Sequence, residues 1–251
     1  KLKTFNAKFL NQKQINNMLT AIENEIIYLP VLLCSIYGLR RSEVLGIKWS
    51  CVDFENNTIH ICETLQQSTK ELTGESNYTD DTKNASSNRT MPLIPVIKEK
   101  LLVHKQWQFE NKKEFEELYS DSDFVFTHEN GSVMTPNYLT KNFRRIADSL
   151  GYHGLRLHDL RHSVASNLLN KGFSYVQTAE WLGHRNPSTT FRFYAHVDKT
   201  SKIAIASDYE QIFREEKSRK VVEKSAKIVE INSYRANSVS YTHLRAHETE
   251  A

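Results

Sequence analysis

The chain has 251 residues, of which 39% are hydrophobic and 25% charged, a composition typical of a globular protein rather than a disordered one. No apolar run approaches the ~18 residues that a membrane helix needs, so we expect no membrane partner. The net charge of +3 is too small to indicate a nucleic-acid partner by itself. Three cysteines without a CxxC pair indicate reduced thiols in a cytoplasmic protein, with Cys34 in the core.

The first part of the chain predicts helices followed by a small sheet. This prediction rests on apolar residues at helical spacing, followed by a glycine that ends a helix. After them come β-prone runs on either side of a turn at 55–57. We expect helices over 12–24, 27–37 and 42–49, and strands over 52–54, 58–62 and, after a polar loop at 66–88, 89–93. The fold class is therefore α+β, mainly helical, with a small antiparallel β-sheet inserted after the third helix.

The second part of the chain returns to helices, several of which are bounded by proline at the start or glycine at the end. We expect a helix over 95–105 that continues weakly to 117, a short strand over 124–126, and helices over 136–150, 158–170, 174–182, 187–195 and 199–231. The last of these is charged and amphipathic.

Four short boxes contain side chains suited to phosphate chemistry. In chain order they are Gly38-Leu39-Arg40-Arg41-Ser42-Glu43, His158-Asp159-Leu160-Arg161-His162, Leu182-Gly183-His184 and Tyr194-Ala195-His196-Val197. An arginine presents a planar, always-charged fork that matches two phosphate oxygens. A tyrosine hydroxyl becomes a covalent nucleophile when its anion and the transition state are stabilised. His158 and Arg161 are three residues apart on a predicted helix, so one phosphate can meet both.

These boxes, in this order over about residues 10–205, resemble the active site of the tyrosine recombinases of the phage integrase family. The resemblance implies that Arg40 and Arg161 bind phosphate oxygens and that His158 acts as an acid, a base or a hydrogen-bond donor. It also implies that His184 donates a hydrogen bond to the phosphate and that Tyr194 is the nucleophile. The reaction that the resemblance implies needs neither a metal ion nor another cofactor.

Two further site residues follow from the same resemblance. The segment from Asp81 to Leu93 resembles the part of the family that carries a general-acid lysine, which selects Lys83, with Lys70 as the competitor in the same polar loop. The pattern Gly-x-Arg-x-x-Glu selects Glu43 as a carboxylate that orients Arg40. A simple interaction of Glu43 with a helix N-terminus is nearly as good an interpretation, and both can hold.

Basic side chains beside these boxes are expected to contact the DNA backbone. They are Arg41, Lys141, Arg144, Arg145 and Arg185. The partners implied are double-stranded DNA at specific recombination sites and three further copies in a homo-tetramer. Because the chain starts with Lys1, we interpret it as a fragment whose N-terminal DNA-binding domain is missing.

We divide the chain into a catalytic domain over 1–205, a C-terminal helix and tail over 206–238 that contacts another protomer, and a non-native tail over 239–251. The last segment back-translates readily into a sequencing adapter, and reading the genomic locus tests this hypothesis. The implied function is integration and excision of a mobile element. The alternatives are a type IB topoisomerase, a catalytically dead DNA-binding protein, and a zinc hydrolase that uses His158 and His162, although Arg161 between such ligands would repel a dication.

Overall fold

A computed structural model describes residues 9–65, 88–184, 186 and 210–211. The chain divides into two compact units, Lys1–Tyr194 and Ala195–Ala251, and the elements below belong to the first. The helices expected over 187–195 and 199–231 lie outside the described residues, apart from Glu210 and Gln211. The predicted division at residue 205 stays a prediction.

The N-terminal part contains three helices around an apolar centre. Helix α1 (Gln12–Ala21) begins with a capping box between Asn11 and Gln14, which satisfies two of its first N–H groups. Helix α2 (Tyr28–Tyr37) is buried over most of its length and ends at Gly38, whose φ of +64° suits glycine. A side chain there would also collide with Leu182. The short α3 (Arg41–Leu45) follows.

The third helix is shorter than the predicted 42–49. It ends at Leu45 because Gly46 lies against the backbone of residues 63 and 64, where a Cβ would sit 2.6 Å from the Glu63 carbonyl oxygen. Ile47 then accepts a hydrogen bond from the Val125 N–H, and Lys48 forms a bridge with Phe124. These long-range backbone contacts replace the last turn of the predicted helix, and a 3₁₀ turn, η1 (Trp49–Cys51), comes next.

The predicted small antiparallel sheet is present. Strands β1 (Val52–Asp53), β2 (Thr58–Ile61) and β3 (Arg89–Pro92) lie in the order β1-β2-β3. Ile59 pairs with Val52 on one side and Met91 on the other, and all three face the core, whereas His60 is exposed. This alternation is that of a sheet with one buried face.

The middle of the chain forms one long helix, followed by a segment without regular secondary structure apart from a 3₁₀ turn and isolated bridges. Helix α4 (Pro95–Phe115) begins with proline and runs unbroken through the part predicted as weak, before the 3₁₀ turn η4 (Glu116–Leu118). The strand expected over 124–126 is wrong: the chain there makes only isolated bridges, Lys48↔Phe124 and Thr127↔Val133. Helix α5 (Pro136–Ser149) then begins at a Thr135 cap.

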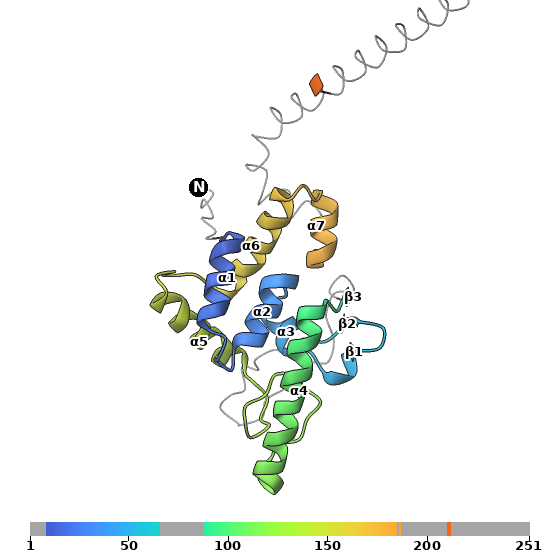
Figure 1. Ribbon diagram of the computed structural model, residues 1–251, viewed down its shortest axis with the longest axis vertical. Helices are drawn as coiled ribbons and strands as arrows, with labels where there is room; N and C mark the ends of the chain where they lie inside the picture. The colour runs from blue at the N-terminus through green and yellow to red at the C-terminus, as the bar shows by residue number, and fades with distance from the viewer. Residues whose placement is uncertain (1–8, 66–87, 185, 187–209, 212–251) are drawn as a thin grey trace, which may run out of the picture. The chain divides into compact units, whose positions relative to one another are not determined.

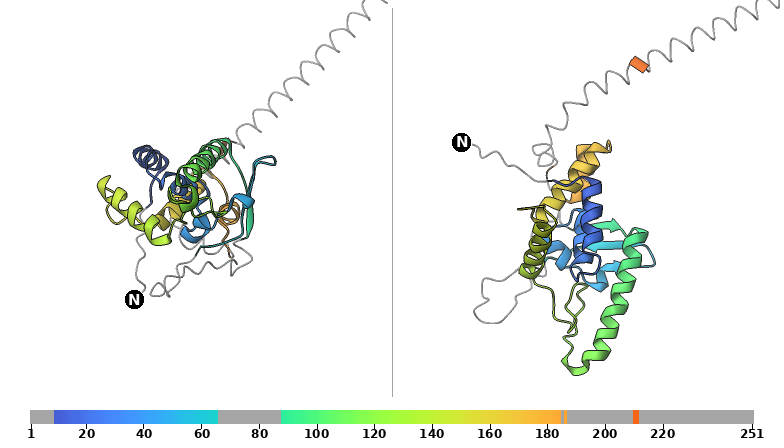
Figure 2. Two further views of the ribbon diagram at one scale, coloured as in Figure 1. Left: turned by 90° about the horizontal axis from the view of Figure 1, so that it is seen from below. Right: turned by 60° about the vertical axis from the view of Figure 1, so that its left-hand side comes forward.

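Two further helices complete the described fold, α6 (Leu157–Asn170) and α7 (Tyr175–Leu182), the latter ending at Gly183. Helix α2 packs against α6, which packs against α7, while α4 and the sheet lie on the other side of α2 (Figures 1 and 2). The end of α2 therefore meets the first half of α6 and the end of α7. Within 9–65 and 88–184, no helix is long and apolar enough to cross a membrane.

Candidate active site

Arg40 stands directly after α2 and is held by Glu43, one turn into α3. Its backbone N–H donates to Glu43 Oε2 at 3.0 Å, and its guanidinium forms an ion pair with the same carboxylate. Arg40 Nη2 also reaches the Gly183 carbonyl at 3.5 Å. Its side chain keeps 37% of its surface exposed, whereas the Glu43 side chain keeps 1%. Glu43 and Gly183 therefore orient the Arg40 guanidinium, and the exposed part of the side chain stays accessible to a ligand.

Arg89, at the start of β3, is a second partner of the buried Glu43 carboxylate. Its Nη2 lies 3.3 Å from Glu43 Oε2, and its side chain is 10% exposed. Burial alone would raise the pKa of Glu43, but the charges of Arg89 and Arg40 lower it below its usual range. Glu43 is thus a charged carboxylate shared by two guanidinium groups, which fits its predicted orienting role and also its place in the first turn of α3.

Arg161 reaches the same place from α6. Its residue surface is only 3% exposed, and Nη1 donates to the Gly38 carbonyl oxygen at 2.7 Å. The left-handed conformation of Gly38 ends α2, so that Arg40 follows two residues later. The same residue offers its carbonyl oxygen to Arg161. This is a physical reason for the Gly-x-Arg spacing.

The histidines of two boxes lie in the field of these arginines. Burial, together with the charges of Arg161 and Arg40, lowers the pKa of His184 to about 4. Burial and Arg161 also lower the pKa of His158. Both imidazoles are therefore neutral at pH 7, and each can donate one N–H or accept one proton. His158 keeps part of its surface exposed on α6, while protein packed around the rest of the ring causes the desolvation; the ring lies edge-on to His162 at a centroid distance of 5.1 Å.

Asp159 caps the helix that carries these residues. Its carboxylate accepts hydrogen bonds from the Arg156 backbone N–H at 2.9 Å and from Arg156 Nη2 at 2.8 Å. Asp159 is 1% exposed, so this reciprocal pair fixes the first turn of α6. Arg156 is therefore the donor that the Asp159 carboxylate orients.

The structure thus brings together four predicted residues: Arg40, Arg161, His158 and His184. The two arginines are positively charged and the two histidines are neutral at pH 7, so the group carries a net positive charge. Four predicted residues lie outside the described residues: Lys83, its competitor Lys70, Arg185 and Tyr194. Asn186 is the last described position before the box that contains Tyr194, and β3 begins at Arg89, shortly after Lys83 in the sequence.

Apart from Arg185, which lies outside the described residues, the residues predicted to contact the DNA backbone lie on α3 and α5. Arg41 is exposed and donates to Thr140 Oγ1 at 3.0 Å, which places it beside Lys141 at the surface. Arg144 and Arg145 are exposed but have acidic neighbours, Asp148 at 3.9 Å and Glu25 at 3.6 Å respectively. Their charges are partly balanced within the protein.

Two residues of the site had no predicted role. Arg89 belongs to the segment that resembles the family, but the sequence predicts no role for it; its place at the start of the returning strand is the signal that could have identified it. Trp181 contributes from α7: Nε1 donates to the Ile36 carbonyl at 3.2 Å and its ring lies 5.9 Å from Tyr37. Trp181 therefore joins the end of α7 to the end of α2.

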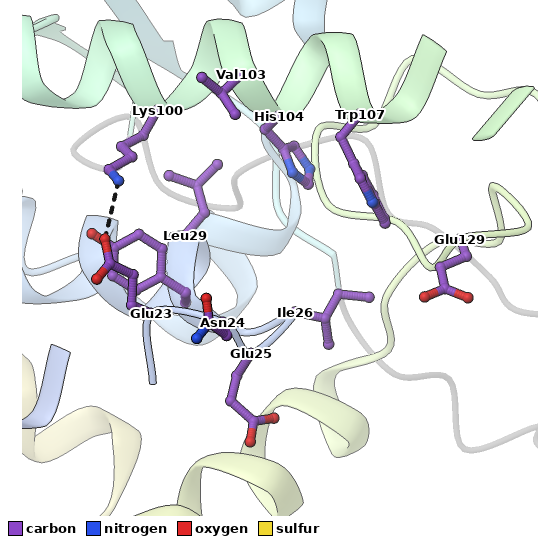
Figure 3. Close-up of a pocket in the computed structure, with 11 residues that line it drawn as sticks. Glu23, Asn24, Glu25, Ile26, Leu29, Lys100, Val103, His104, Trp107 and Glu129 are labelled. Atoms are coloured by element: carbon purple, nitrogen blue, oxygen red, sulfur yellow. Dashed lines mark hydrogen bonds and ion pairs between the residues drawn. The ribbon is translucent and has the colours of Figure 1, made fainter. Parts of the chain in front are cut away.

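A separate pocket of about 350 Å³ lies between α4 and the loop that joins α1 to α2. Figure 3 shows Lys100 paired with Glu23 on one side and the rings of His104 and Trp107 above. Tyr28 and Leu29 line it at the start of α2, whereas the arginines gather at the other end of that helix. The pocket is thus not the site built by the three described boxes.

Comparison with known proteins agrees with this arrangement. Residues 8–201 match the model of the phage integrase family. The chain is 29% identical over 212 residues to a tyrosine recombinase XerC-like protein of Caldanaerobacter subterraneus, covering 79% of this chain and 53% of that protein. It is 27% identical over 186 residues to the transposase of transposon Tn916 from Enterococcus faecalis, covering 70% and 44%. The chain spans about half the length of these relatives.

Solved structures give the same fold. The Tn1549 transposon integrase, in complex with a circular intermediate DNA, superposes with a TM-score of 0.67 at 21% identity, covering 82% of this chain and 66% of that one. The XerH recombinase bound to a palindromic difH substrate, a post-cleavage complex, gives a TM-score of 0.57 at 26% identity, covering 81% and 54%.

Proposed function

The chain belongs to the phage integrase family of tyrosine recombinases, and we propose that it cleaves and rejoins DNA strands at specific sites through a 3′-phosphotyrosyl intermediate. The observation that carries the proposal is the meeting of Arg40 and Arg161 at the end of α2, each held by a group of the protein behind it. A pair of fixed guanidinium forks is suited to a phosphodiester whose charge increases during reaction.

The arginines act by stabilising the transition state. As a nucleophile approaches phosphorus, negative charge builds on the non-bridging oxygens, and Arg40, Arg161 and His184 supply donors to them. Because Glu43 and the Gly38 carbonyl already orient the two guanidinium groups, little reorganisation is needed when the substrate binds. In phosphoryl transfer, such clamps contribute up to several powers of ten in rate.

The bond changes are balanced without a cofactor. The Tyr194 hydroxyl loses its proton and attacks phosphorus, the phosphorus–O5′ bond breaks, and Lys83 gives a proton to the leaving 5′ oxygen. His158, neutral at pH 7, accepts the proton that the Tyr194 hydroxyl loses and returns it to the tyrosine oxygen when the strands are rejoined. A 5′ hydroxyl of a partner strand then attacks the phosphotyrosine and restores the tyrosine. The energy of the phosphodiester is kept in the ester, so neither ATP nor a metal ion is required.

The wider function is the integration and excision of a mobile element. Tn916 and Tn1549 proteins among the similar proteins support this proposal, and the complexes of Tn1549 integrase and XerH with DNA support double-stranded DNA as the partner. We propose a homo-tetramer on paired recombination sites, completed by an N-terminal DNA-binding domain. Arg41, Lys141, Arg144, Arg145 and Arg185 would contact the DNA backbone.

The test is covalent capture on a nicked suicide substrate, whose sequence comes from the DNA flanking the gene. Strand cleavage next to the nick releases a short fragment, so the reverse reaction fails and the protein–DNA adduct accumulates. We expect the wild type to form the adduct and Tyr194→Phe to bind the DNA without forming it, because only the hydroxyl is lost. A wild type that binds this DNA but forms no adduct refutes the function, and an adduct with Tyr194→Phe refutes the choice of nucleophile.

A further inference from the structure

Two cysteine thiols lie together at the edge of the sheet, away from the four boxes in sequence. Cys51 ends the turn η1, and Cys62 directly follows β2. The hairpin of β1 and β2 folds back on itself and brings the two sulfur atoms to 3.5 Å. Both residues are half-buried, so a small solute can reach them while protein surrounds part of the site.

A carboxylate completes the group. Glu63 is also half-buried, and its ligand atom and the two sulfur atoms all lie within 4.8 Å of one another. Among the described residues, this is the one group of three such side chains that gathers closely enough to share an ion. Glu63 Oε2 lies 2.5 Å from Lys48 Nζ. A carboxylate has two oxygens, so it can keep this ion pair and still offer a ligand.

The separation of the sulfur atoms, which is that of two hydrogen-bonded thiols, is also close to the separation of two thiolates on one metal ion and too long for a disulfide bond. Two thiolates at the usual zinc–sulfur distance of about 2.3 Å and a tetrahedral angle are about 3.8 Å apart. A disulfide requires about 2.05 Å. The observed 3.5 Å is therefore a few tenths of an ångström from the metal-bound separation and well over an ångström from the disulfide.

We propose that Cys51, Cys62 and Glu63 bind a divalent cation of the zinc class, with water as the fourth ligand. Thiolates favour zinc over calcium or magnesium, and four-coordination with mixed sulfur and oxygen ligands is within its chemistry. The two thiols release their protons as the ion binds, so binding strengthens as pH rises. The ion has no part in the phosphate chemistry proposed above.

The consequence is structural, because the same segment lies against α3. The Leu65 N–H donates to the Ser42 carbonyl at 2.9 Å, and the backbone at Glu63 and Thr64 touches Gly46. An ion on Cys62 and Glu63 would therefore link η1 to the chain that supports α3, the helix that carries Glu43. Binding to the folded state alone raises its stability with metal concentration.

The test uses Co²⁺ as a spectroscopic substitute on the reduced 251-residue chain. We expect one cobalt per chain and a near-ultraviolet thiolate-to-cobalt band that zinc displaces. Cys51→Ser and Cys62→Ser should lose the band, Glu63→Gln should bind at least about tenfold more weakly, and the matched control Cys34→Ala should retain it. Tm should rise with zinc in the wild type and in Cys34→Ala, but not in Cys51→Ser.

A second measurement needs no variant. Zinc should protect Cys51 and Cys62 of the wild type from alkylation, mapped by mass spectrometry, and a chelator should reverse the protection. The absence of a band, a band that persists in Cys51→Ser and Cys62→Ser, or protection that zinc does not alter would overturn the proposal. So would a Cys51–Cys62 disulfide that forms in zinc-loaded protein with a small-molecule disulfide, because bound thiolates should resist that exchange.

Discussion

Replacing Gly183 with alanine tests how the end of α7 supports the arginine cluster. Gly183 has a φ of +68°, and a Cβ there would lie 2.5 Å from Arg89 Nη1 and 2.9 Å from Cζ. The Arg89 guanidinium would have to move, although it is paired with the buried Glu43 carboxylate. The substitution therefore acts on backbone and ion pair together.

The magnitude has two parts. A non-glycine residue in the left-handed region costs about 1–2 kcal/mol. Loss of a hydrogen bond to a charged group costs about 1.5–3 kcal/mol when Arg89 leaves Glu43. We expect Gly183→Ala to lower the free energy of unfolding by about 2.5–5 kcal/mol in total, the upper part of the range for single substitutions.

Urea denaturation with two matched glycines separates the parts. Gly151 and Gly172 have φ values of +83° and +91°, and a Cβ at either would meet nothing within 4 Å. Gly151→Ala and Gly172→Ala should therefore show the backbone cost alone, about 1–2 kcal/mol. In an Arg89→Ala background the collision is gone, so Gly183→Ala should cost only that same amount.

Equal losses for the three alanine variants would refute the reasoning, since they would show that Arg89 moves aside without cost. An unchanged cost of Gly183→Ala in the Arg89→Ala background would refute it as well. A changed slope of free energy against urea concentration would indicate altered compactness of one state, so the comparison rests on variants with a common slope.

Three other predictions concern chemistry and pH. Arg161→Lys should cleave DNA orders of magnitude more slowly in a suicide-substrate assay, because an ammonium cannot hold the Gly38 carbonyl and a phosphate with one planar fork; a near-normal rate contradicts the clamp. Lys83→Ala should be slow on a normal strand but near wild type on a 5′-phosphorothiolate, whose leaving thiolate needs no proton. Rescue of Lys70→Ala instead would reassign the general acid. In the folded protein the pKa values of His162 and His184 are about 4, below the ordinary 6.5. Between these two pH values the unfolded chain binds more protons than the folded one, so the free energy of unfolding should fall as pH drops from about 6.5 towards 4. His184→Gln should flatten that part of the unfolding profile measured against pH, and an unchanged profile argues against a buried neutral imidazole.

Much of the local structure could be predicted from the sequence because it depends on neighbouring residues. The helix stops at Gly38 and Gly183 are both in the left-handed region, as a glycine after an apolar run predicts. The antiparallel sheet follows from β-prone runs around a turn. The family also followed from the boxes, because its residues keep fixed spacings along the chain, whereas the roles of Lys83 and Tyr194 stay predictions.

The sequence could not determine where an element ends when that end depends on contacts with residues far away along the chain. The third helix stops at Leu45 because residues 63–64 and 124–125 pack against the chain that follows it, and no local pattern announces those partners. The run at 124–126 is β-prone, but a strand also needs a neighbour to pair with along its length, and here it finds only single bridges.

The tertiary structure alone decided how the charged residues share partners. Glu43 was expected beside Arg40, but the second guanidinium group that it binds belongs to Arg89, on a strand 46 residues away. Arg161 donates a hydrogen bond to a carbonyl oxygen 123 residues away. The pairing of Cys51 with Cys62 arises in the same way, from the folding of a hairpin. Spacing along a chain fixes only which side chains share a local face, whereas packing of the buried apolar core determines which distant faces meet and which charges must then be paired.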